Sequence, residues 1–287
     1  MSKKSLLSVL AIISLSGLVS CGGGAKYSKL QGSTMGTYYS ITYGEGDSCS
    51  PQKKAVDNLL AHINSVMSTY EPDSELSLIN QNLQAGEYAI SQELHLVLGA
   101  SLMVWQETRG AFDITIGPLV NLWGFGPTNA EETPTEFEQE AVAERIGMEN
   151  LELASNSIVK KQPNLFIDLS AIAKGYAVDR VAEKLSSLGC KDYLVDIGGE
   201  SFAKGQNRAG TPWKIGIEVP SPERRGIQRV LALSDLAIAT SGDYRNFRET
   251  AVGRVSHVMD PRNKLPVTSN IVSATVLHRS AMMADAY

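Results

Sequence analysis

The sequence predicts an α/β protein of the α+β kind, in which mixed sheets pack against helices. A strand-like segment follows residue 29, helical patterns dominate the next part, and strands and helices alternate in the second half. In addition, 43% of the 287 residues are hydrophobic and 20% are charged. These proportions are ordinary for a globular protein with a substantial core.

The first 20 residues have the composition of a secretory signal peptide. Lys3 and Lys4 precede an apolar run from Leu6 to Val19. This run is too short to cross a bilayer, because a membrane-spanning helix needs about 20 apolar residues. Residues 1–20 are therefore expected to be removed from the mature protein.

The signal ends in Leu18-Val19-Ser20-Cys21, which matches the bacterial lipobox and predicts a lipoprotein acylated at Cys21, with palmitate among its acyl chains. Residues 21–28 include three consecutive glycines and are expected to form a flexible tether in front of a domain at 29–287. The domain is then expected to work outside the cytoplasm, held to a membrane. The alternative is an ordinary cleaved signal followed by an incidental cysteine.

The first half of the domain is expected to contain two strands and three helices. The strands lie between Lys29 and Tyr43, around Thr34-Met35-Gly36-Thr37. Pro51 opens a helix that ends before Pro72, and Asp73 or Ser74 caps a short one toward Asn80. Ser91 caps the third, whose inward side chains recur at helical spacing: Leu94, Val97, Leu98, Leu102 and Trp105.

Residues 111–127 combine aromatic side chains with glycines and prolines every few positions. Neither a helix nor a strand accounts for this pattern, so a rigid loop that lines a site is expected. Residues 128–147 are expected to form an acidic connection and a solvated helix.

In the second half, strands are expected at 165–169, 193–197, 213–219, 231–239 and 271–277. A helix capped by Ser170 and closed by Gly189 lies between the first two strands. Ser280 begins a last helical stretch. The sequence stops within its second turn at Tyr287, and we expect the sequence to be a fragment that lacks its C-terminal part.

The composition argues against several functions. A net charge of −5 and a pI near 5.5 argue against nucleic-acid binding, which needs a basic surface. The sequence has no C-x-x-C or H-E-x-x-H zinc motif and neither of the common glycine-rich nucleotide motifs. Cys49 and Cys190 could pair in an oxidising compartment, but one distant pair is weak evidence, and we expect two unpaired or structural thiols.

Four segments concentrate polar side chains where strands are expected to end: 168–176, 196–201, 240–244 and 256–261. Ligands bind at such strand ends in α/β sheets. A helix that starts at Ser170 would present free backbone N–H groups to a phosphate, and Lys174 would add charge. Each segment alone also has a structural explanation: helix capping for Asp168, a turn for Gly198-Gly199 and for 260–263, and a packing role for His257.

Taken together and in order, these segments resemble the ApbE-type FAD:protein FMN transferases. The resemblance rests on the lipobox and on segments that span nearly the whole domain: 34–37, 68–80, 112–126, 168–179, 196–200, 241–244, 256–261 and 284–286. It implies an ApbE/T-fold-like catalytic domain at 29–287. It also implies a magnesium-dependent enzyme that transfers the FMN part of FAD to a threonine or serine hydroxyl of an acceptor protein and releases AMP.

The resemblance also assigns roles to particular residues. Asp285 and the carbonyl of Ala171 would bind Mg²⁺, with a further threonine ligand expected two residues beyond Tyr287. His257 would be the catalytic base, since its ordinary pKa is nearest to neutrality. FAD would be bound by Met35, Tyr70, Ala111, Phe112, Asp113, Asp168, Lys174 and Met259.

Two other functions would use the same residues. A metal-dependent FAD pyrophosphatase would use water as the nucleophile and yield FMN and AMP, and a non-catalytic flavin-binding lipoprotein would lack the metal. For a transferase, the family implies acceptors among flavin-carrying subunits of the Na⁺-pumping NADH:quinone oxidoreductase or a related electron-transport complex. The family also implies the periplasmic side of the inner membrane, although Gly22 is not an inner-membrane retention aspartate.

Overall fold

The computed structural model describes residues 26–287 except 47–48, 127–132, 222, 245 and 251–252. The expected signal peptide and the lipidation site Cys21 lie outside the described residues. Within the described part, no helix is both long enough and apolar enough to cross a membrane.

A six-stranded sheet forms the centre of the fold, in the order β1-β2-β6-β7-β10-β15, and its pairings are antiparallel. The strands are β1 (Tyr27–Thr34), β2 (Thr37–Gly44), β6 (Tyr193–Ile197), β7 (Glu200–Lys204), β10 (Leu236–Gly242) and β15 (Ser273–His278). Strand β1 begins at Tyr27, so the last two residues of the segment expected as a tether already belong to the sheet.

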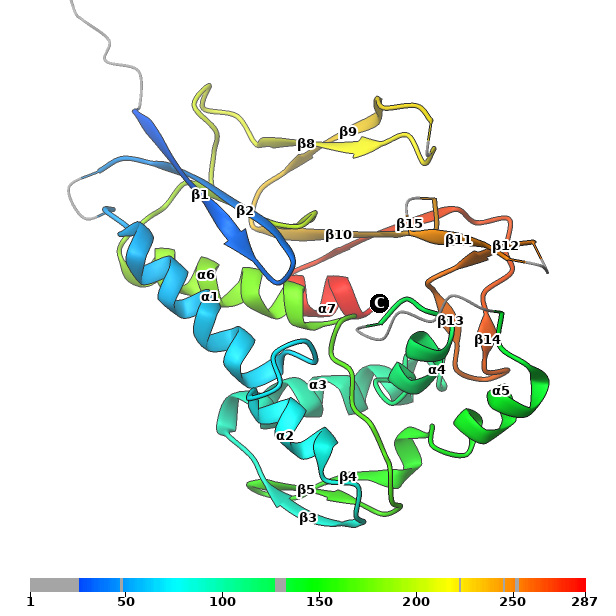
Figure 1. Cartoon of the computed structure of the whole chain (residues 1–287). Coiled ribbons are helices and arrows are strands. Elements are labelled where there is room, and N and C mark those ends of the chain that lie inside the picture. The colour runs from blue at the N-terminus through cyan, green and yellow to red at the C-terminus, as the bar shows by residue number, and fades with distance from the viewer. Residues whose placement is uncertain (1–25, 47–48, 127–132, 222, 245, 251–252) are drawn as a thin grey trace, which may run out of the picture.

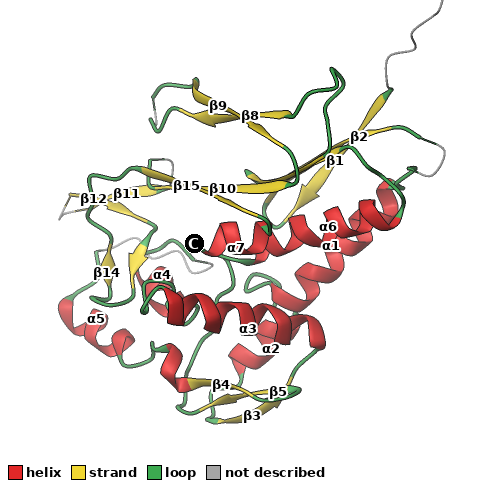
Figure 2. Ribbon diagram, turned by 180° about the vertical axis from the view of Figure 1, so that it is seen from behind, coloured by secondary structure: helices red, strands yellow, loops and turns green. Residues whose placement is uncertain are grey.

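Helices cover one face of this sheet, and the hairpin of β8 (Trp213–Glu218) and β9 (Ile227–Leu233) lies over the other (Figures 1 and 2). The covering helices are α1 (Lys53–Met67), α6 (Ala173–Ser187) and α7 (Ala281–Ala286). Below them lie α2 (Glu75–Gln81), α3 (Gln92–Glu107) and a small sheet of β3 (Gly86–Ala89), β5 (Ser157–Lys160) and β4 (Leu151–Leu153). The main core fills the space between the sheet and these helices.

Shorter elements close one end of the molecule. They are α4 (Gly117–Leu122), α5 (Glu136–Ala143), a 3₁₀ turn at Met148–Asn150, and the hairpins β11 (Phe247–Thr250) with β12 (Gly253–Ser256) and β13 (Met259–Asp260) with β14 (Leu265–Pro266). A second, smaller core packs Leu119 and Trp123, in and after α4, against Val255 and Met259 of the two hairpins.

The expected helix caps are confirmed where a hydroxyl precedes the helix. The Oγ atoms of Ser74, Ser91 and Ser280 each accept a hydrogen bond from the backbone three residues later, at the starts of α2, α3 and α7. Each bond satisfies one of the free N–H groups of a first turn.

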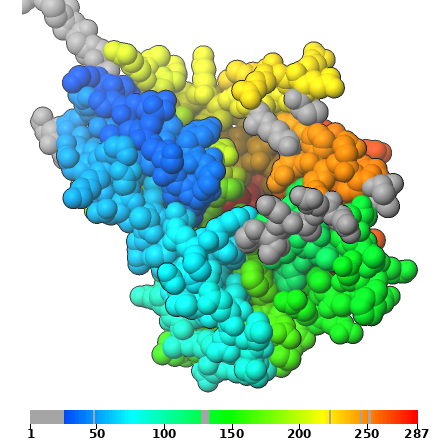
Figure 3. Space-filling view, viewed as in Figure 1, coloured from blue at the N-terminus to red at the C-terminus, as the bar shows by residue number. Residues whose placement is uncertain are grey.

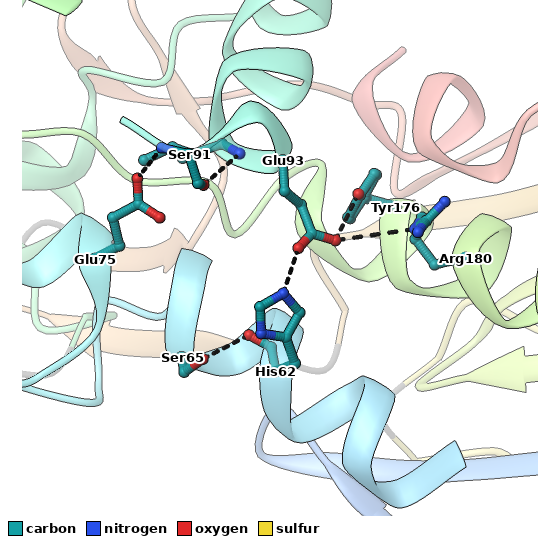
Figure 4. A network of polar contacts seen from close by, with 8 residues as sticks. His62, Ser65, Glu75, Ser91, Glu93, Tyr176 and Arg180 are labelled. Atoms are coloured by element: carbon teal, nitrogen blue, oxygen red, sulfur yellow. Dashed lines mark hydrogen bonds and ion pairs between the residues drawn. The ribbon is translucent and has the colours of Figure 1, made fainter. Parts of the chain in front are cut away.

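The first turn of α3 joins three helices through Glu93 (Figure 4). The carboxylate of Glu93 lies 2.8 Å from Nε2 of His62 on α1 and accepts a 2.7 Å hydrogen bond from the Tyr176 hydroxyl on α6. Burial and the hydrogen bond to Glu93 raise the pKa of Tyr176. Glu93 therefore ties the start of α6 to both α3 and α1.

Four expected elements differ from the structure. Residues 165–169 form no strand, although Leu165, Ile167 and Leu169 are buried alternately as strand residues are. The Asn80 side chain donates to the Ile167 carbonyl and accepts from its N–H, both at 2.8 Å, and so takes the place of a neighbouring strand. The strand expected at 231–239 is two strands, because the chain turns at Asp235, where φ is +55°.

Ser170 does not begin the helix that it was expected to cap. Helix α6 begins at Ala173 with Ile172 at its N-cap. Asp168 accepts hydrogen bonds from the backbone N–H and the hydroxyl of Ser170, at 2.8 and 2.5 Å, which forms a separate turn before the helix. Likewise, the expected loop at 111–127 includes the short helix α4, with Pro118 in its first turn.

Cys49 and Cys190 form a disulfide, so the expectation of two unpaired or structural thiols was wrong. Cys49 follows β2 and Cys190 precedes β6, and these two strands are antiparallel neighbours in the sheet. The pairing of the strands therefore brings together two cysteines that are 141 residues apart in the sequence.

We expect the disulfide to stabilise the fold, because it closes a long loop in the unfolded chain. Replacing Cys190 with Ser should lower the free energy of unfolding by about 2–5 kcal/mol, measured by urea denaturation. Dithiothreitol should produce a similar loss in the unaltered protein and none in the variant. Equal stability of the oxidised and reduced proteins would contradict this prediction.

Candidate active site

The structure gathers the expected site residues around one cavity of about 620 Å³, which lies where the helical layer meets the strands near the C-terminus. In the space-filling view, the surface is hollowed between the N-terminal half and the C-terminal strands (Figure 3). The cavity is lined by Tyr70, Ala111, Phe112, Asp113, Asp168, Ala171, Lys174, His257, Met259 and Asp285. Met35 lines a neighbouring cavity of about 580 Å³, which shares Tyr70, Ser170 and Lys174.

The floor of the cavity depends on a close contact between α6 and α7. A Cβ atom at Gly175 would lie 2.2 Å from the Ala281 carbonyl oxygen and 2.7 Å from Cβ of Asp285. Only glycine allows the two helices to approach this closely. The contact lets the N–H of Gly175 donate a 2.9 Å hydrogen bond to Oδ2 of Asp285.

A second carboxylate on α6 holds the start of α7. Asp179 accepts hydrogen bonds from the Ser280 hydroxyl and from the backbone N–H groups of Ala281 and Met282, at 2.6, 2.7 and 3.0 Å. A negative charge is favourable at this end of a helix. Asp179 therefore fixes the position from which α7 presents Asp285.

Lys174 lies between two buried carboxylates. Its Nζ is 2.8 Å from Oε1 of Glu200, at the start of β7, and 3.7 Å from Oδ1 of Asp285. The side chains of Glu200 and Asp285 are only 8% and 7% exposed. One ammonium therefore faces two carboxylates, and in their ionised forms one negative charge remains uncompensated.

The pKa values follow from this arrangement. Burial alone would lower the pKa of Lys174, but the charges of Asp285 and Glu200 outweigh it and raise the pKa. Burial raises the pKa of Glu200 to about 7, opposed by Lys174 and assisted by Asp285. Burial also raises the pKa of Asp285, with Lys174 and the Gly175 N–H opposing. Lys174 stays protonated, and the cluster as a whole favours an additional positive charge.

One wall of the cavity is the loop that contains Ala111, Phe112 and Asp113. The Asp113 carboxylate accepts from the N–H and the hydroxyl of Thr115, at 2.7 and 2.5 Å, and so holds the turn of its own loop. Burial raises the pKa of Asp113. The carbonyl of Ile114 accepts a 2.7 Å hydrogen bond from the N–H of Asp168, which ties this loop to the segment before α6.

His257 lies on the opposite wall, after β12, and is half-buried. Its Nδ1 is 3.0 Å from the carbonyl oxygen of Asn246, and Phe125 contacts the ring edge to face. Because a carbonyl only accepts, Nδ1 of the neutral ring carries the proton and Nε2 remains an acceptor. Burial lowers the pKa of His257, which favours this neutral form.

Met35 and Tyr70 lie at the cavity mouth. Met35 occupies the tight turn between β1 and β2 with φ +49°, and Gly36 follows at φ +68°. A non-glycine residue in this region is strained, and such strain is frequent at ligand sites. The Tyr70 side chain is 64% exposed and offers aromatic surface beside the cavity.

The sequence did not identify every residue that shapes the site. Glu200, Asp179 and Asn80 were noticed only as parts of motifs, and none was expected to act in the site. Glu200 directly follows Gly198-Gly199, the tight turn that joins β6 to β7, and this was the available signal. The contacts of Asp179 and Asn80 join segments that are far apart in sequence, so periodicity cannot reveal them.

The oxygen atoms around the cavity suit Mg²⁺ better than a softer metal. No group of three or more histidine, cysteine, aspartate or glutamate side chains that could hold a metal occurs among the described residues. Asp285 supplies a buried carboxylate, Ala171 lines the same cavity, and the buried Oε2 of Glu200 has no hydrogen-bond partner among the residues placed by the structure. Mg²⁺ binds through few protein oxygens and keeps water and phosphate oxygens as its other ligands, so these residues fit it.

Residues 35–287 match the model of the ApbE family, and this range includes every site residue described above. The chain belongs to the ApbE family. The sequence matches this family, and the mixed fold of sheets and helices also matches solved structures of its members.

The chain is similar to named proteins over most of its own length and most of theirs. A FAD:protein FMN transferase of Vibrio cholerae is 44% identical over 96% of this chain and 84% of that protein, and one of Haemophilus influenzae is 39% identical over 99% and 85%. Among solved structures, the flavin transferase ApbE from Vibrio cholerae superposes with a TM-score of 0.84 at 43% identity, covering 91% of this chain and 85% of that one. The ApbE protein of Thermotoga maritima gives 0.82 at 28% identity, covering 91% and 84%.

The contact at Gly175 yields a test of the site. Gly175→Ala should force α7 away from α6, lower the free energy of unfolding by about 1–3 kcal/mol and weaken Mg²⁺ binding. Gly99→Ala on α3 is the matched control, because its new Cβ would meet its nearest neighbour, Leu153, at an ordinary 3.5 Å. Calorimetry of unfolding and of Mg²⁺ binding measures both effects. Equal behaviour of the two variants would argue against the contact.

Proposed function

We infer that this chain is a flavin transferase, which transfers the FMN part of FAD to an acceptor protein. Family membership over residues 35–287 and the FAD:protein FMN transferases among its relatives support this function. The decisive observation in the structure is the single cavity that contains Asp168, Ala171, His257 and Asp285 together with Lys174. These groups suit a reaction at a pyrophosphate.

The proposed reaction is an attack by an acceptor threonine or serine hydroxyl on the flavin-side phosphorus of FAD. The new bond joins the hydroxyl oxygen to this phosphorus, and the bond to the bridging oxygen breaks, so that AMP leaves with that oxygen. Nε2 of His257 accepts the hydroxyl proton, since Nδ1 is held by the Asn246 carbonyl. Mg²⁺, when bound by Asp285 and the Ala171 carbonyl, would neutralise charge on the phosphoryl oxygens.

The other residues of the chain bind and orient the dinucleotide. The Lys174 ammonium is placed to meet a phosphate oxygen. Phe112 and Tyr70 offer ring surface to the flavin or the adenine, and the Asp168 carboxylate accepts from sugar hydroxyls. Met35, Ala111, Asp113 and Met259 complete the expected contacts with FAD.

Hydrolysis of FAD to FMN and AMP is the second candidate, because water in place of the acceptor hydroxyl would use the same base and the same phosphorus. The half-buried position of His257 favours it as a base in either reaction. The choice between the two depends on whether an acceptor segment reaches the cavity through the mouth beside Tyr70.

We further propose that the protein is a lipoprotein anchored at Cys21, facing the periplasm at the inner membrane, with acceptors in a Na⁺-pumping NADH:quinone oxidoreductase or a related electron-transport complex. The Cys49–Cys190 disulfide supports an oxidising compartment. Mass spectrometry of the membrane-extracted protein should find acyl chains on an N-terminal Cys21; an unmodified N-terminus would refute the anchor.

The transfer reaction is tested with the full-length protein, FAD, Mg²⁺ and an acceptor that carries a Ser/Thr-Gly-Ala-Thr-type segment. Flavin fluorescence should remain on the denatured acceptor, AMP should appear in equal amount, and EDTA should suppress both. An acceptor whose hydroxyl residue is replaced by alanine is the control. Free FMN without labelled acceptor would establish the hydrolase instead.

If His257 is the base, its replacement should affect the transfer of FMN but not the binding of FAD. His257→Ala should keep the affinity for FAD while transfer falls by about 10²–10⁴-fold. In the unaltered protein the protonation of His257 should lower the rate on acidification, with its midpoint below the ordinary imidazole value of about 6.5, because burial lowers the pKa of His257. The variant should lack this acid limb. Parallel loss of FAD binding and transfer would assign a structural role instead.

A further inference from the structure

Glu200 is a buried carboxylate in the cavity wall to which the reaction above assigns no role. The tight turn at Gly198 and Gly199 separates β6 from β7, and Glu200 is the first residue of β7, paired with Ile197. One of its oxygens binds Lys174 at 2.8 Å. The other, Oε2, is fully buried and has no hydrogen-bond partner in the part of the chain that the structure describes.

Burying a carboxylate oxygen without a hydrogen-bond partner costs folding free energy. This cost argues that Glu200 serves the site and not only the stability of the fold. The turn does not need its side chain, because β6 and β7 are held by backbone pairing. The side chain instead extends to Lys174, a residue of α6 that is distant in the sequence. Glu200 therefore acts on the electrostatics of the cavity.

The geometry makes Glu200 and Asp285 competitors for one ammonium. Nζ of Lys174 is 0.9 Å closer to Glu200 than to Asp285, since the two distances are 2.8 and 3.7 Å. Oδ2 of Asp285 is engaged by the Gly175 N–H. Oδ1 is thus the oxygen that remains for a cation, and Lys174 stands just outside hydrogen-bond distance of it.

We propose that Glu200 is a positioning residue that holds the Lys174 ammonium away from Asp285 and so keeps Oδ1 of Asp285 open to a divalent cation. Without Glu200, Lys174 would pair with Asp285 and compete with the metal for the same oxygen. With Glu200 in place, Lys174 and the cation occupy separate positions, each beside a carboxylate. This inference rests on the proposed Mg²⁺ site.

Two alternatives give different results. If Glu200 binds the cation directly through Oε2, or attracts it only by its charge, its removal weakens cation binding whether or not Lys174 is present. If Glu200 acts through Lys174, its removal has no effect once Lys174 is gone. A double-mutant cycle between the two positions therefore distinguishes the mechanisms.

The experiment measures binding of Mg²⁺ alone, without FAD, to the full-length protein by isothermal titration calorimetry. Glu200→Gln should weaken binding by about tenfold or more, the usual scale of a lost charge contact within a buried pair. Lys174→Met should tighten binding relative to the unaltered protein, because it removes the competing ammonium. The double variant should bind Mg²⁺ as Lys174→Met does.

Glu93→Gln is the matched control. Glu93 is also a shielded carboxylate bound to the start of α6, but its partners among the described residues are Tyr176, His62 and Arg180 and not Lys174 (Figure 4). It should leave Mg²⁺ affinity unchanged within about twofold, on the scale of ordinary surface effects. Thermal unfolding of each variant shows whether it is folded. Should Glu200→Gln fail to fold, Lys174→Met and Glu200→Asp decide the question, the latter expected between the unaltered protein and the Gln variant.

Three outcomes would overturn the inference: an unchanged affinity in Glu200→Gln, an equal loss in the Lys174→Met background, or weaker binding in Lys174→Met alone. The acceptor assay tests the proposed function independently of the Mg²⁺ titrations. A protein that transfers FMN but binds no Mg²⁺ would remove the metal site and this inference together while leaving the transferase in place. A protein that binds Mg²⁺ with the predicted pattern but labels no acceptor would retain the inference and refute the transferase.

Discussion

The close contact between α6 and α7 is the constraint on which the rest of the site depends. Gly175 allows the backbone of α6 to meet α7 directly, and its N–H fixes one oxygen of Asp285. Asp179, one turn further along α6, holds the first N–H groups of α7. A single helix thus supplies both the contact and the cap that place Asp285, and it also supplies Lys174 in its own first turn. Small displacements of α7 would change all of these distances together.

The contact between α6 and α7 brings Lys174 close to Asp285 and Glu200. The charges of these three side chains explain why the cavity suits a metal ion together with a pyrophosphate. Two shielded carboxylates and one lysine leave a negative balance that would favour a divalent cation, and such a cation together with Lys174 would favour phosphate. His257 lies on a wall formed by the C-terminal hairpins, where burial, assisted by the charge of Lys174, lowers its pKa and favours the neutral form. The charged groups of the cluster and the proposed base thus come from different elements of the fold.

Much of the fold could be predicted from the sequence because local chemistry determines it, whereas most of the lining of the site was expected from the resemblance of the motifs to a known family. Ser74 and Ser91 cap helices through their own hydroxyls, and the ordered motifs placed residues from Tyr70 to Asp285 around one cavity. The errors arose where a distant residue replaces a local signal. Asn80 gives the segment at 165–169 its hydrogen bonds without a neighbouring strand, and the pairing of β2 with β6 joins Cys49 to Cys190. The environment of Glu200 likewise exists only after β7 has come to lie beside α6.

The assembly of the cavity also has a consequence for biosynthesis. Its walls combine the turn at Met35, the start of α6 and the carboxylate of Asp285 on α7, which the ribosome makes in that order and far apart in time. A nascent polypeptide that has emerged only as far as β15 has the lysine and the histidine but not the carboxylate that completes the cluster. The carboxylate that would hold the metal therefore joins the site only once α7 has docked against α6.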